Sequence, residues 1–555
     1  MSQSWYTGNM IRDELNKIIK GDVEFNEATL QKYSHDASFL EIKPEVVVFP
    51  KNTEDVKNLV KFVRRKKEQG ENVSLAPRSA GTDMTGGPLT EKIVVEFTRY
   101  FNRIKEVGEG YAITEPGVYY RDFEKETLKK GYFLPSYPAS REICAVGGMV
   151  ANNSGGEKNL KYGKTENYIL ELKAVFSDGE EYIIKPLNDT EMTDKMKLQN
   201  FEGEFYRKMY SLAIENYELL KDAKPKVSKN SAGYYLWNVY DKEKGVFDLT
   251  KLFTGSQGTL GIITEIKFRL VKPEPYSGLL VIFMKDLKEV GVIVNEVLMF
   301  KPTSFESFDD HTFKLAMKYF ADFLKKMFAK NIIHLALKFL PEFFLMVTYG
   351  IPKLVLLAEF EEKEQGIVEK KIKELKNKLG KFKVKMKVAR TKGEAQKYWL
   401  MRRESFNLLR EKVKDKKTAP FIDDVIVKPE KLPEFLPKLY EILDKYELLY
   451  TVAGHAGDGN FHIIPLMNLV EEKERKKIPK VAEEVYKLVL NFDGSITAEH
   501  NDGLIRSPYL KQMYGEKVYE LFEETKKIFD PLNIFNPGKK VGANWEYAME
   551  HIRKI

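Results

Sequence analysis

Ala76-Pro77-Arg78-Ser79-Ala80-Gly81-Thr82-Asp83-Met84-Thr85-Gly86-Gly87 is the stretch of sequence that decides the fold. It lies between residues 73–76 and 93–97, two short apolar runs that predict buried strands. The small residues, glycines and hydroxyls between them predict a loop whose backbone N–H groups can approach an anion. A strand connection that binds nothing is the plain alternative. Because the spacing G-x-G-x-x-G is absent and no helix opens at its end, the loop disfavours a Rossmann site.

The residues before this loop predict α/β packing. Residues 46–50 form an apolar run that ends at a proline, which predicts a buried strand. Thr53 is then the predicted cap of a helix, because apolar residues follow it at helical spacing. Strand, helix, strand, glycine loop and strand thus follow one another within a short stretch, as α/β units do.

Two more glycine-rich segments lie further along the chain, at residues 146–156 and 253–264, and each abuts a predicted strand. The first contains a pair of asparagines that can hydrogen-bond a polar ligand. Residues 168–186, between the two, predict a hairpin that turns at Asp178-Gly179. Three glycine loops beside strands suggest one extended ligand.

Composition restricts the class of protein. A chain of 555 residues with 43% hydrophobic and 31% charged residues predicts two or more globular domains. The net charge of +8 comes from 90 basic and 82 acidic residues that are interspersed, so we expect no nucleic-acid partner. Cys144 is the single cysteine, which excludes an intrachain disulfide and a cysteine-ligated cluster. The N-terminus lacks a signal pattern and no window is apolar enough to span a membrane, so we expect a cytoplasmic location.

The chain changes character near residues 272–275, where we place a domain boundary. From residue 278 onward predicted strands alternate with predicted helices, which suits an antiparallel sheet with helices on one face. Residues 321–353 interrupt this pattern with crowded apolar side chains and several lysines. They predict either a helical insertion packed on the domain or a patch that docks on a membrane or a partner subunit.

Three of the seven histidines lie in two short stretches of the last third. His455 and His462 flank residues 457–460, a tight-turn sequence that can bring both imidazoles to one point. Two histidines and a carboxylate suit Zn, Mn or Fe, and Glu499 is the natural third ligand. His500 points the other way in extended chain and can accept a proton from a metal-held hydroxyl. The alternative for each histidine is an ordinary packed residue.

Together these segments resemble the FAD-linked oxidoreductases of the vanillyl-alcohol-oxidase and p-cresol-methylhydroxylase (PCMH) type. Within them the likeness is to the D-2-hydroxy-acid dehydrogenase branch: D-lactate dehydrogenase, D-2-hydroxyglutarate dehydrogenase and the flavin subunit of glycolate oxidase. HAGDGNFH at 455–462, AEH at 498–500 and NPGK at 536–539 carry the resemblance, which runs over about residues 40–540.

The resemblance implies an α+β fold with a two-subdomain PCMH-type FAD-binding domain and an inserted ferredoxin-like antiparallel α+β cap. The FAD-binding domain would span 1–275 and the substrate or cap domain 276–500, with the hydrophobic insertion at 321–353. Residues 501–555 would form a C-terminal segment that returns to the FAD domain.

The resemblance also implies residue roles. The cofactor, FAD, would be bound by Arg78, Ser79, Ala80, Gly81, Thr82, Thr85, Pro138, Gly147, Gly148, Asn152, Gly155, Gly163, Ile262 and Asn536. His455, His462 and Glu499 would hold the divalent metal, and His500 would be the catalytic base. Arg402 closes a W-x-x-R segment and is the expected clamp for the substrate carboxylate, with Arg403 as the fallback. No histidine lies in the first loop, so we expect FAD to be bound without a covalent link.

The sequence departs from the family after the Glu-His pair. The family usually has glycine there, whereas here Asn501 and Asp502 precede Gly503. Asparagine tolerates left-handed backbone, so the turn can survive. We expect Asp502 to add a carboxylate near the site and to alter the choice of substrate.

The sequence hypothesis is FAD-dependent, metal-assisted oxidation of a small D-2-hydroxy acid to the 2-oxo acid, with hydride passing to flavin N5. D-lactate is the first candidate, with D-2-hydroxyglutarate and glycolate as others, and a quinone or an electron-transfer protein would accept the electrons. Peripheral contact with the inner face of a membrane through 321–353 and a homodimer stay open. The alternatives are alkyl-dihydroxyacetonephosphate-synthase-like flavin adduct chemistry and a non-catalytic flavin or metal subunit of an electron-transfer complex.

Overall fold

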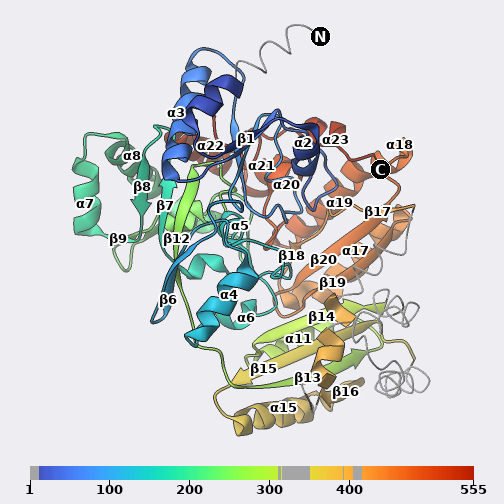
Figure 1. Cartoon of the computed structure of the whole chain (residues 1–555). Helices are drawn as coiled ribbons and strands as arrows, with labels where there is room; N and C mark the ends of the chain where they lie inside the picture. The colour runs from blue at the N-terminus through green and yellow to red at the C-terminus, as the bar shows by residue number, and fades with distance from the viewer. Residues whose placement is uncertain are drawn as a thin grey trace.

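A computed structural model of the chain describes residues 12–310, 314, 350–389, 391, 393–399, 401–403 and 415–554. Its strands form four sheets, two of which make the upper part of Figure 1 while the largest lies toward the lower right. Of the segment predicted to be a hydrophobic insertion, residues 321–349 lie outside the described ranges. In the described ranges, no helix combines the length and the apolar character needed to cross a membrane.

The first sheet has the order β1-β2-β4-β3, with β2 and β3 both parallel to β4. Its strands are β1 (Asp22–Glu24), β2 (Val46–Phe49), β3 (Leu75–Arg78) and β4 (Ile93–Glu96), and α2 (Glu27–Tyr33) precedes β2. Helix α3 (Thr53–Glu68) joins β2 to β3 and buries its predicted apolar face. The predicted α/β unit is therefore confirmed, although the residue that caps the helix is Asn52 and not Thr53.

The second sheet is antiparallel, with the order β5-β6-β12-β7-β8. Its strands are β5 (Ile104–Gly108), β6 (Tyr111–Thr114), β7 (Ile169–Val175), β8 (Glu181–Ile184) and β12 (Ile262–Arg269). The predicted hairpin is β7 and β8. The prediction of a loop at the second glycine-rich segment is wrong, because α5 (Val146–Asn152) is a short helix.

Smaller elements cover this second sheet. A three-stranded sheet joins β9 (Leu187–Asn188), β10 (Tyr240–Asp241) and β11 (Val246–Phe247). The helices nearby are α4 (Tyr120–Lys129), α6 (Asn159–Tyr162), α7 (Asp189–Lys197), α8 (Phe201–Glu215), α9 (Tyr217–Ala223) and α10 (Thr250–Phe253).

The largest sheet is antiparallel and has the order β16-β13-β15-β14-β19-β20-β17, with β18 also paired to β20. Its strands are β13 (Tyr276–Met284), β14 (Ser304–Asp309), β15 (Leu354–Glu362), β16 (Val384–Ala389), β17 (Lys417–Thr418), β18 (Val425–Ile426), β19 (Leu449–His455) and β20 (Asn460–Met467). The helices that share most of one hydrophobic core with this sheet are α11 (Val290–Leu298), α15 (Gln365–Leu379), α17 (Leu432–Lys445) and α19 (Lys477–Asn491). This is the predicted antiparallel sheet with helices on one face (Figure 1).

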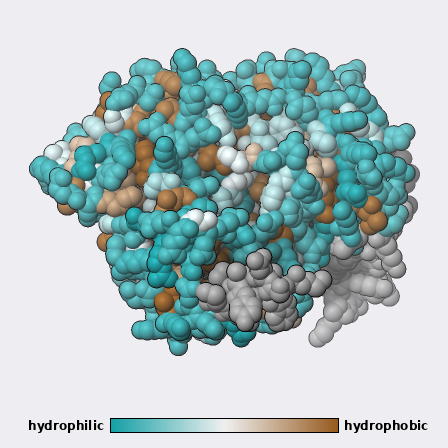
Figure 2. Space-filling model, turned by 90° about the horizontal axis from the view of Figure 1, so that it is seen from above, coloured by the Kyte–Doolittle hydropathy of each residue, from teal (hydrophilic) through white to brown (hydrophobic). Residues whose placement is uncertain are grey.

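The end of the chain comes back to the first two sheets. Helices α18 (Glu472–Arg475), α20 (Gly503–Arg506), α21 (Leu510–Tyr514), α22 (Glu516–Phe529) and α23 (Trp545–Glu550) follow β20. Side chains of α22 join the core of the second sheet, and Phe535 pairs with Leu75 of β3. The face of the molecule in Figure 2 is largely hydrophilic, with apolar residues scattered over it.

Candidate functional site

A cavity of about 710 Å³ lies where the glycine-rich segments of the first two sheets face the largest sheet. Ten of the fourteen residues predicted to bind FAD line it: Arg78, Ser79, Ala80, Gly81, Thr82, Pro138, Gly147, Gly148, Asn152 and Gly155. Glu306, Arg402, Asp423, His455, His462, Glu499 and His500 line the same cavity. One space therefore joins the predicted cofactor loops to the predicted chemistry.

The other four predicted FAD residues lie off the cavity wall. Thr85 donates its hydroxyl to Asp83, and Ile262 is fully buried in the core of the first sheet. Gly163 ends α6 with positive φ. Asn536 donates to the carbonyl oxygens of Gly87 and Gln257, at 2.9 and 2.7 Å, and so ties two glycine segments together.

Two glycines of α5, Gly147 and Gly148, determine how closely other groups can approach the helix at the cavity wall. A Cβ on Gly147 would lie 2.6 Å from the Pro116 carbonyl oxygen, so only glycine lets α5 approach that turn. A Cβ on Gly148 would meet no protein atom closer than 4.0 Å and would project from the cavity wall. Glycine at such a position lets a ligand come close to the backbone, as the FAD prediction requires.

Strand alternation explains why the histidines face the cavity. Tyr450 and Val452 of β19, and Phe461 and Ile463 of β20, belong to the core under the helices. The residues that alternate with them line the cavity on the opposite face: Thr451, Ala453 and His455 of β19, and His462 and Ile464 of β20. Glu306 of β14 follows the same rule, because its neighbour Phe305 lies in the core.

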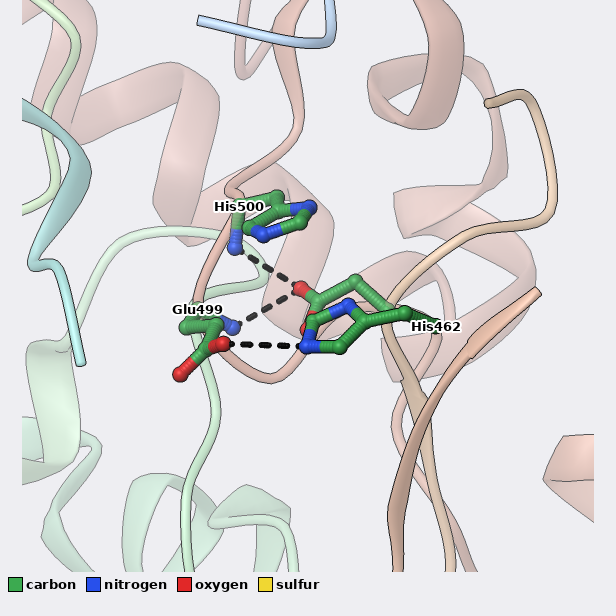
Figure 3. A group of neighbouring side chains, drawn as sticks. His462, Glu499 and His500 are labelled. Carbon is green, nitrogen blue, oxygen red and sulfur yellow. Dashed lines mark hydrogen bonds and ion pairs between the residues drawn. The ribbon is translucent and has the colours of Figure 1, made fainter. Parts of the chain in front are cut away.

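The three predicted metal ligands converge. Glu499 Oε1 lies 2.9 Å from His455 Nε2 and 3.3 Å from His462 Nε2. Figure 3 shows the Glu499 carboxylate facing the His462 ring. An ion between these atoms would have two imidazole nitrogens and one carboxylate oxygen as ligands, with further positions open to a substrate.

Two carboxylates fix the imidazoles from behind. His455 Nδ1 lies 2.5 Å from Glu306 Oε1, and His462 Nδ1 lies 3.1 Å from Asp423 Oδ1. A carboxylate at Nδ1 is the usual partner of a metal-binding histidine, because it holds the N–H there and leaves the lone pair on Nε2. The donor set thus fits a divalent metal.

His500 shares one of these carboxylates. Its Nδ1 lies 2.7 Å from Asp423 Oδ2, and its ring stacks on His462 with centroids 4.9 Å apart. Burial opposes the charged form of both rings, but the Asp423 carboxylate outweighs it. It raises the pKa of His462 to about 10 and keeps the pKa of His500 above its ordinary value. With Nδ1 engaged, His500 can accept a proton at Nε2.

Asp424 fixes the backbone that carries Glu499 and His500. Its Oδ2 accepts the backbone N–H groups of Ala498, Glu499 and His500, at 2.7–2.9 Å, and the Thr497 hydroxyl. A metal could also be held by Asp424, His462, Glu499 and His500, whose ligand atoms lie within 4.8 Å of one another. Because Oδ2 of Asp424 already accepts four hydrogen bonds and Oδ1 accepts one from Asn460, we favour the set with His455.

The turn after His500 has the expected backbone conformation at Asn501, but the Asp502 carboxylate does not lie where we expected it. Asn501 has φ +70° and so supplies the left-handed residue that the family usually provides with glycine. The expectation that Asp502 adds a carboxylate near the site is wrong, because Asp502 is fully buried and does not line the cavity. Its Oδ2 accepts from Lys540 Nζ at 2.7 Å and from the Gly233 N–H at 2.9 Å.

The two candidate arginines differ in their partners. Arg403 makes a bidentate ion pair with Glu157, at 2.6 and 2.5 Å, and lies over the Trp399 ring. Arg402 Nε lies 2.9 Å from Glu306 Oε2, which is its one ionic partner in the described part of the chain. Arg402 is therefore the better placed of the two to receive a substrate carboxylate.

Sequence reasoning missed Glu306, Asp423, Asp424 and Lys229, all of which are buried beside the predicted site. A signal for the aspartates existed, because a pair of acids stands between the apolar residues 421–422 and 425–427. Lys229 Nζ lies 3.0 Å from Glu499 Oε2, and no local pattern marks it.

Comparisons with known proteins show which domains and folds the chain is similar to. Residues 275–540 match the C-terminal domain of FAD linked oxidases, and residues 44–184 match an FAD binding domain. Solved structures with the same fold include p-cresol methylhydroxylase (TM-score 0.67, 16% identity, 97% of both chains) and 4-ethylphenol oxidase from Gulosibacter chungangensis (TM-score 0.68, 16% identity, 99% of both chains).

Three curated relatives cover most of the chain. The D-2-hydroxyglutarate dehydrogenase of Pseudomonas putida is 26% identical over 94% of this chain and 51% of its own length. Glycolate oxidase subunit GlcD of Bacillus subtilis is 27% identical over 95% of this chain and 96% of its own. The D-lactate dehydrogenase of Archaeoglobus fulgidus is 26% identical over 89% and 91%. The chain spans about half the length of the D-2-hydroxyglutarate dehydrogenases that it matches first.

The fold is of the PCMH type, with mixed helices and strands in several sheets, and residues 44–184 match an FAD binding domain. The chain belongs to the FAD-linked oxidoreductases that pair an FAD binding domain with the C-terminal domain of FAD linked oxidases.

Proposed function

We propose that the chain oxidises a D-2-hydroxy acid to the 2-oxo acid, with the help of FAD and a divalent metal. The observation that carries the proposal is the convergence of His455 Nε2, His462 Nε2 and Glu499 Oε1 in the cavity that the glycine segments line. His500 and Arg402 face the same space. The site thus offers a place for a hydroxyl oxygen, a proton acceptor and a carboxylate clamp.

Each residue has a distinct task in this reaction. FAD would accept the hydride from the substrate carbon, and Zn, Mn or Fe would make the hydroxyl more acidic. Arg402 would bind the carboxylate through its outer nitrogens, since Nε already faces Glu306. His500 would take the hydroxyl proton at Nε2, because its Nδ1 is held by Asp423. The cavity walls would keep water from the reacting carbon.

The charges in the cavity favour a monocarboxylate such as D-lactate over D-2-hydroxyglutarate. The arginines of the described lining other than Arg402 are engaged: Arg78 by two carbonyl oxygens, Arg141 by Glu124 and Arg403 by Glu157. Next to the histidines the sheet presents Thr451, Ala453 and Ile464. A second carboxylate there would have no cation to pair with in the described lining and would lie near acidic residues.

The test is the visible spectrum of purified protein, recorded anaerobically before and after D-lactate, L-lactate, D-2-hydroxyglutarate and glycolate. We expect D-lactate to bleach the flavin spectrum and L-lactate to leave it unchanged. EDTA, which removes the metal, should prevent the bleaching by D-lactate. A flavin spectrum that none of the acids changes would refute the proposed reaction. It would favour the synthase-like alternative, since an alkyldihydroxyacetonephosphate synthase shares the fold (TM-score 0.64, 14% identity, 96% of this chain and 84% of that one).

Electron transfer out of the site completes the proposal. A quinone or an electron-transfer protein would reoxidise the flavin, so we expect dehydrogenase behaviour with slow turnover on oxygen. The test compares steady-state rates with a soluble quinone analogue and with oxygen on the same preparation. It distinguishes dehydrogenase from oxidase behaviour. Faster turnover with oxygen alone would contradict this part of the proposal.

A further inference from the structure

We propose that Glu306 is a positioning residue that sets the metal-facing imidazole of His455 and the carboxylate clamp Arg402 with one side chain. The proposal rests on the proposed function, because it gives both partners a role in binding the 2-hydroxy acid. Its geometric basis is independent of which acid that is.

The two oxygens of Glu306 serve different partners. Oε1 lies 2.5 Å from His455 Nδ1, and Oε2 lies 2.9 Å from Arg402 Nε. The side chain is 1% exposed and projects from β14, in the middle of the largest sheet, onto its cavity face. A rigid strand and a buried carboxylate therefore fix the separation between His455 and Arg402.

The contact with His455 determines which ring nitrogen is free. A carboxylate at Nδ1 favours the N–H on that atom and the lone pair on Nε2, the atom that lies 2.9 Å from Glu499 Oε1. Without this partner, the ring could take the other tautomer or rotate. Glu306 thus prepares His455 as a ligand before any ion arrives.

The ion pair with Arg402 places the guanidinium beside Glu306, with Nε 2.9 Å from Oε2, although neither atom makes a hydrogen bond in the described part of the chain. Because Nε faces Glu306, the two outer nitrogens are left for a substrate carboxylate, which arginine binds best in bidentate geometry. The same carboxylate also balances the charge of a cation that is largely buried. A 2-hydroxy acid carries its hydroxyl and carboxylate on one carbon, so a fixed spacing between metal ligand and clamp matches the substrate.

A merely structural role, in which Glu306 only neutralises a buried charge, makes different predictions. It would change the stability of the fold and leave the affinities of a correctly folded protein unchanged. The decisive measurements are therefore affinities, made on folded and FAD-loaded protein.

The experiment compares Glu306→Gln with Ser307→Ala, a control on the same strand whose side chain faces the opposite side of the sheet. EDTA-stripped protein is titrated with Zn²⁺, and pyruvate is titrated against the flavin spectrum of the metal-loaded protein. We expect E306Q to weaken Zn²⁺ binding about 10–100-fold and pyruvate binding at least tenfold, and to raise KM for D-lactate in parallel. The FAD content and spectrum of both variants should match the wild type.

Several outcomes would overturn the proposal. Zn²⁺ and pyruvate affinities of folded E306Q within twofold of the wild type would do so, and a wild type that binds no divalent metal would refute the His455 part. If E306Q does not fold, Glu306→Asp keeps the charge but shortens the reach, and the same two losses are expected. If the wild type oxidises no 2-hydroxy acid, the proposed function fails, while the Zn²⁺ titration still decides whether Glu306 prepares His455.

Discussion

Gly148→Ala tests directly whether the cavity holds FAD. Gly148 lies in α5, and a Cβ there would meet only Ser79 Cβ, at 4.0 Å. The backbone is in the ordinary helical region, so alanine should stabilise the apoprotein by about 0.5–1 kcal/mol relative to glycine. The substitution thus adds one methyl group to the cavity wall without lowering the stability of the apoprotein.

The effect on FAD should have the opposite sign. If the cofactor packs against this wall, the added methyl overfills the contact at a cost of about 1–3 kcal/mol. At about 1.4 kcal/mol per factor of ten, FAD should then bind about 5- to 150-fold more weakly. Loss of the cofactor together with an unchanged or slightly raised Tm of the apoprotein is a result that general destabilisation does not produce.

The assay is titration of the apoprotein with FAD, followed by flavin fluorescence, beside the thermal melting of the apoprotein. Gly366→Ala in α15 is the matched control, because a Cβ there also meets nothing within 4 Å and lies far from the cavity lining. Gly147→Ala should lower Tm through its clash with the Pro116 carbonyl. An FAD Kd for G148A within twofold of the wild type would refute the placement of FAD on α5.

Four further substitutions test the rest of the site. His500→Ala should slow flavin reduction by D-lactate about 10²–10⁴-fold with FAD content unchanged, in a stopped-flow trace. Asp424→Ala removes the acceptor of three backbone N–H groups and should cost on the order of 3–5 kcal/mol in urea unfolding. Asp502→Asn leaves Lys540 buried without its partner and should cost about 3–5 kcal/mol, while the ratio of kcat/KM for D-lactate and D-2-hydroxyglutarate stays constant. Burial and neighbouring carboxylates raise the pKa of Glu359 to about 8 from 4.5. The wild type should therefore lose stability as pH rises through this interval, because the folded state still holds a proton that the unfolded state has already lost. Glu359→Gln should not show this loss when Tm is measured against pH.

The fold could be predicted from the sequence where local pattern and packing agree. The apolar runs of β2 and β4 and the helical spacing in α3 are such cases, because burial on the core face sets the pattern. Helix α5 was missed because glycine disfavours helix locally. Here the close approach of Gly147 to Pro116 requires glycine, so the residue reports packing against a turn instead of a flexible loop.

Site residues that lie in short sequence motifs could be predicted. Site residues that become neighbours only through the fold could not. His455, His462 and Glu499 come from recognisable motifs, and the structure brings them together. Glu306 comes from a strand about 150 residues before its histidine partner, and only the pairing of β14 with β19 makes them neighbours. An acid in a strand of alternating polar and aromatic residues gives no indication of which residue it will contact.

The AEH segment is also held by two lysines from the first part of the chain. Lys229 Nζ lies 3.0 Å from Glu499 Oε2 and 3.6 Å from Asp458, and Lys164 Nζ donates to the Ala498 carbonyl oxygen at 2.8 Å. Since Oε2 is occupied by Lys229, Glu499 presents only Oε1 to the imidazoles. Residues of the proposed cofactor-binding part therefore determine how the proposed metal ligand faces the cavity. It follows that the orientation of the Glu499 carboxylate toward the cavity depends on contacts between both parts of the chain.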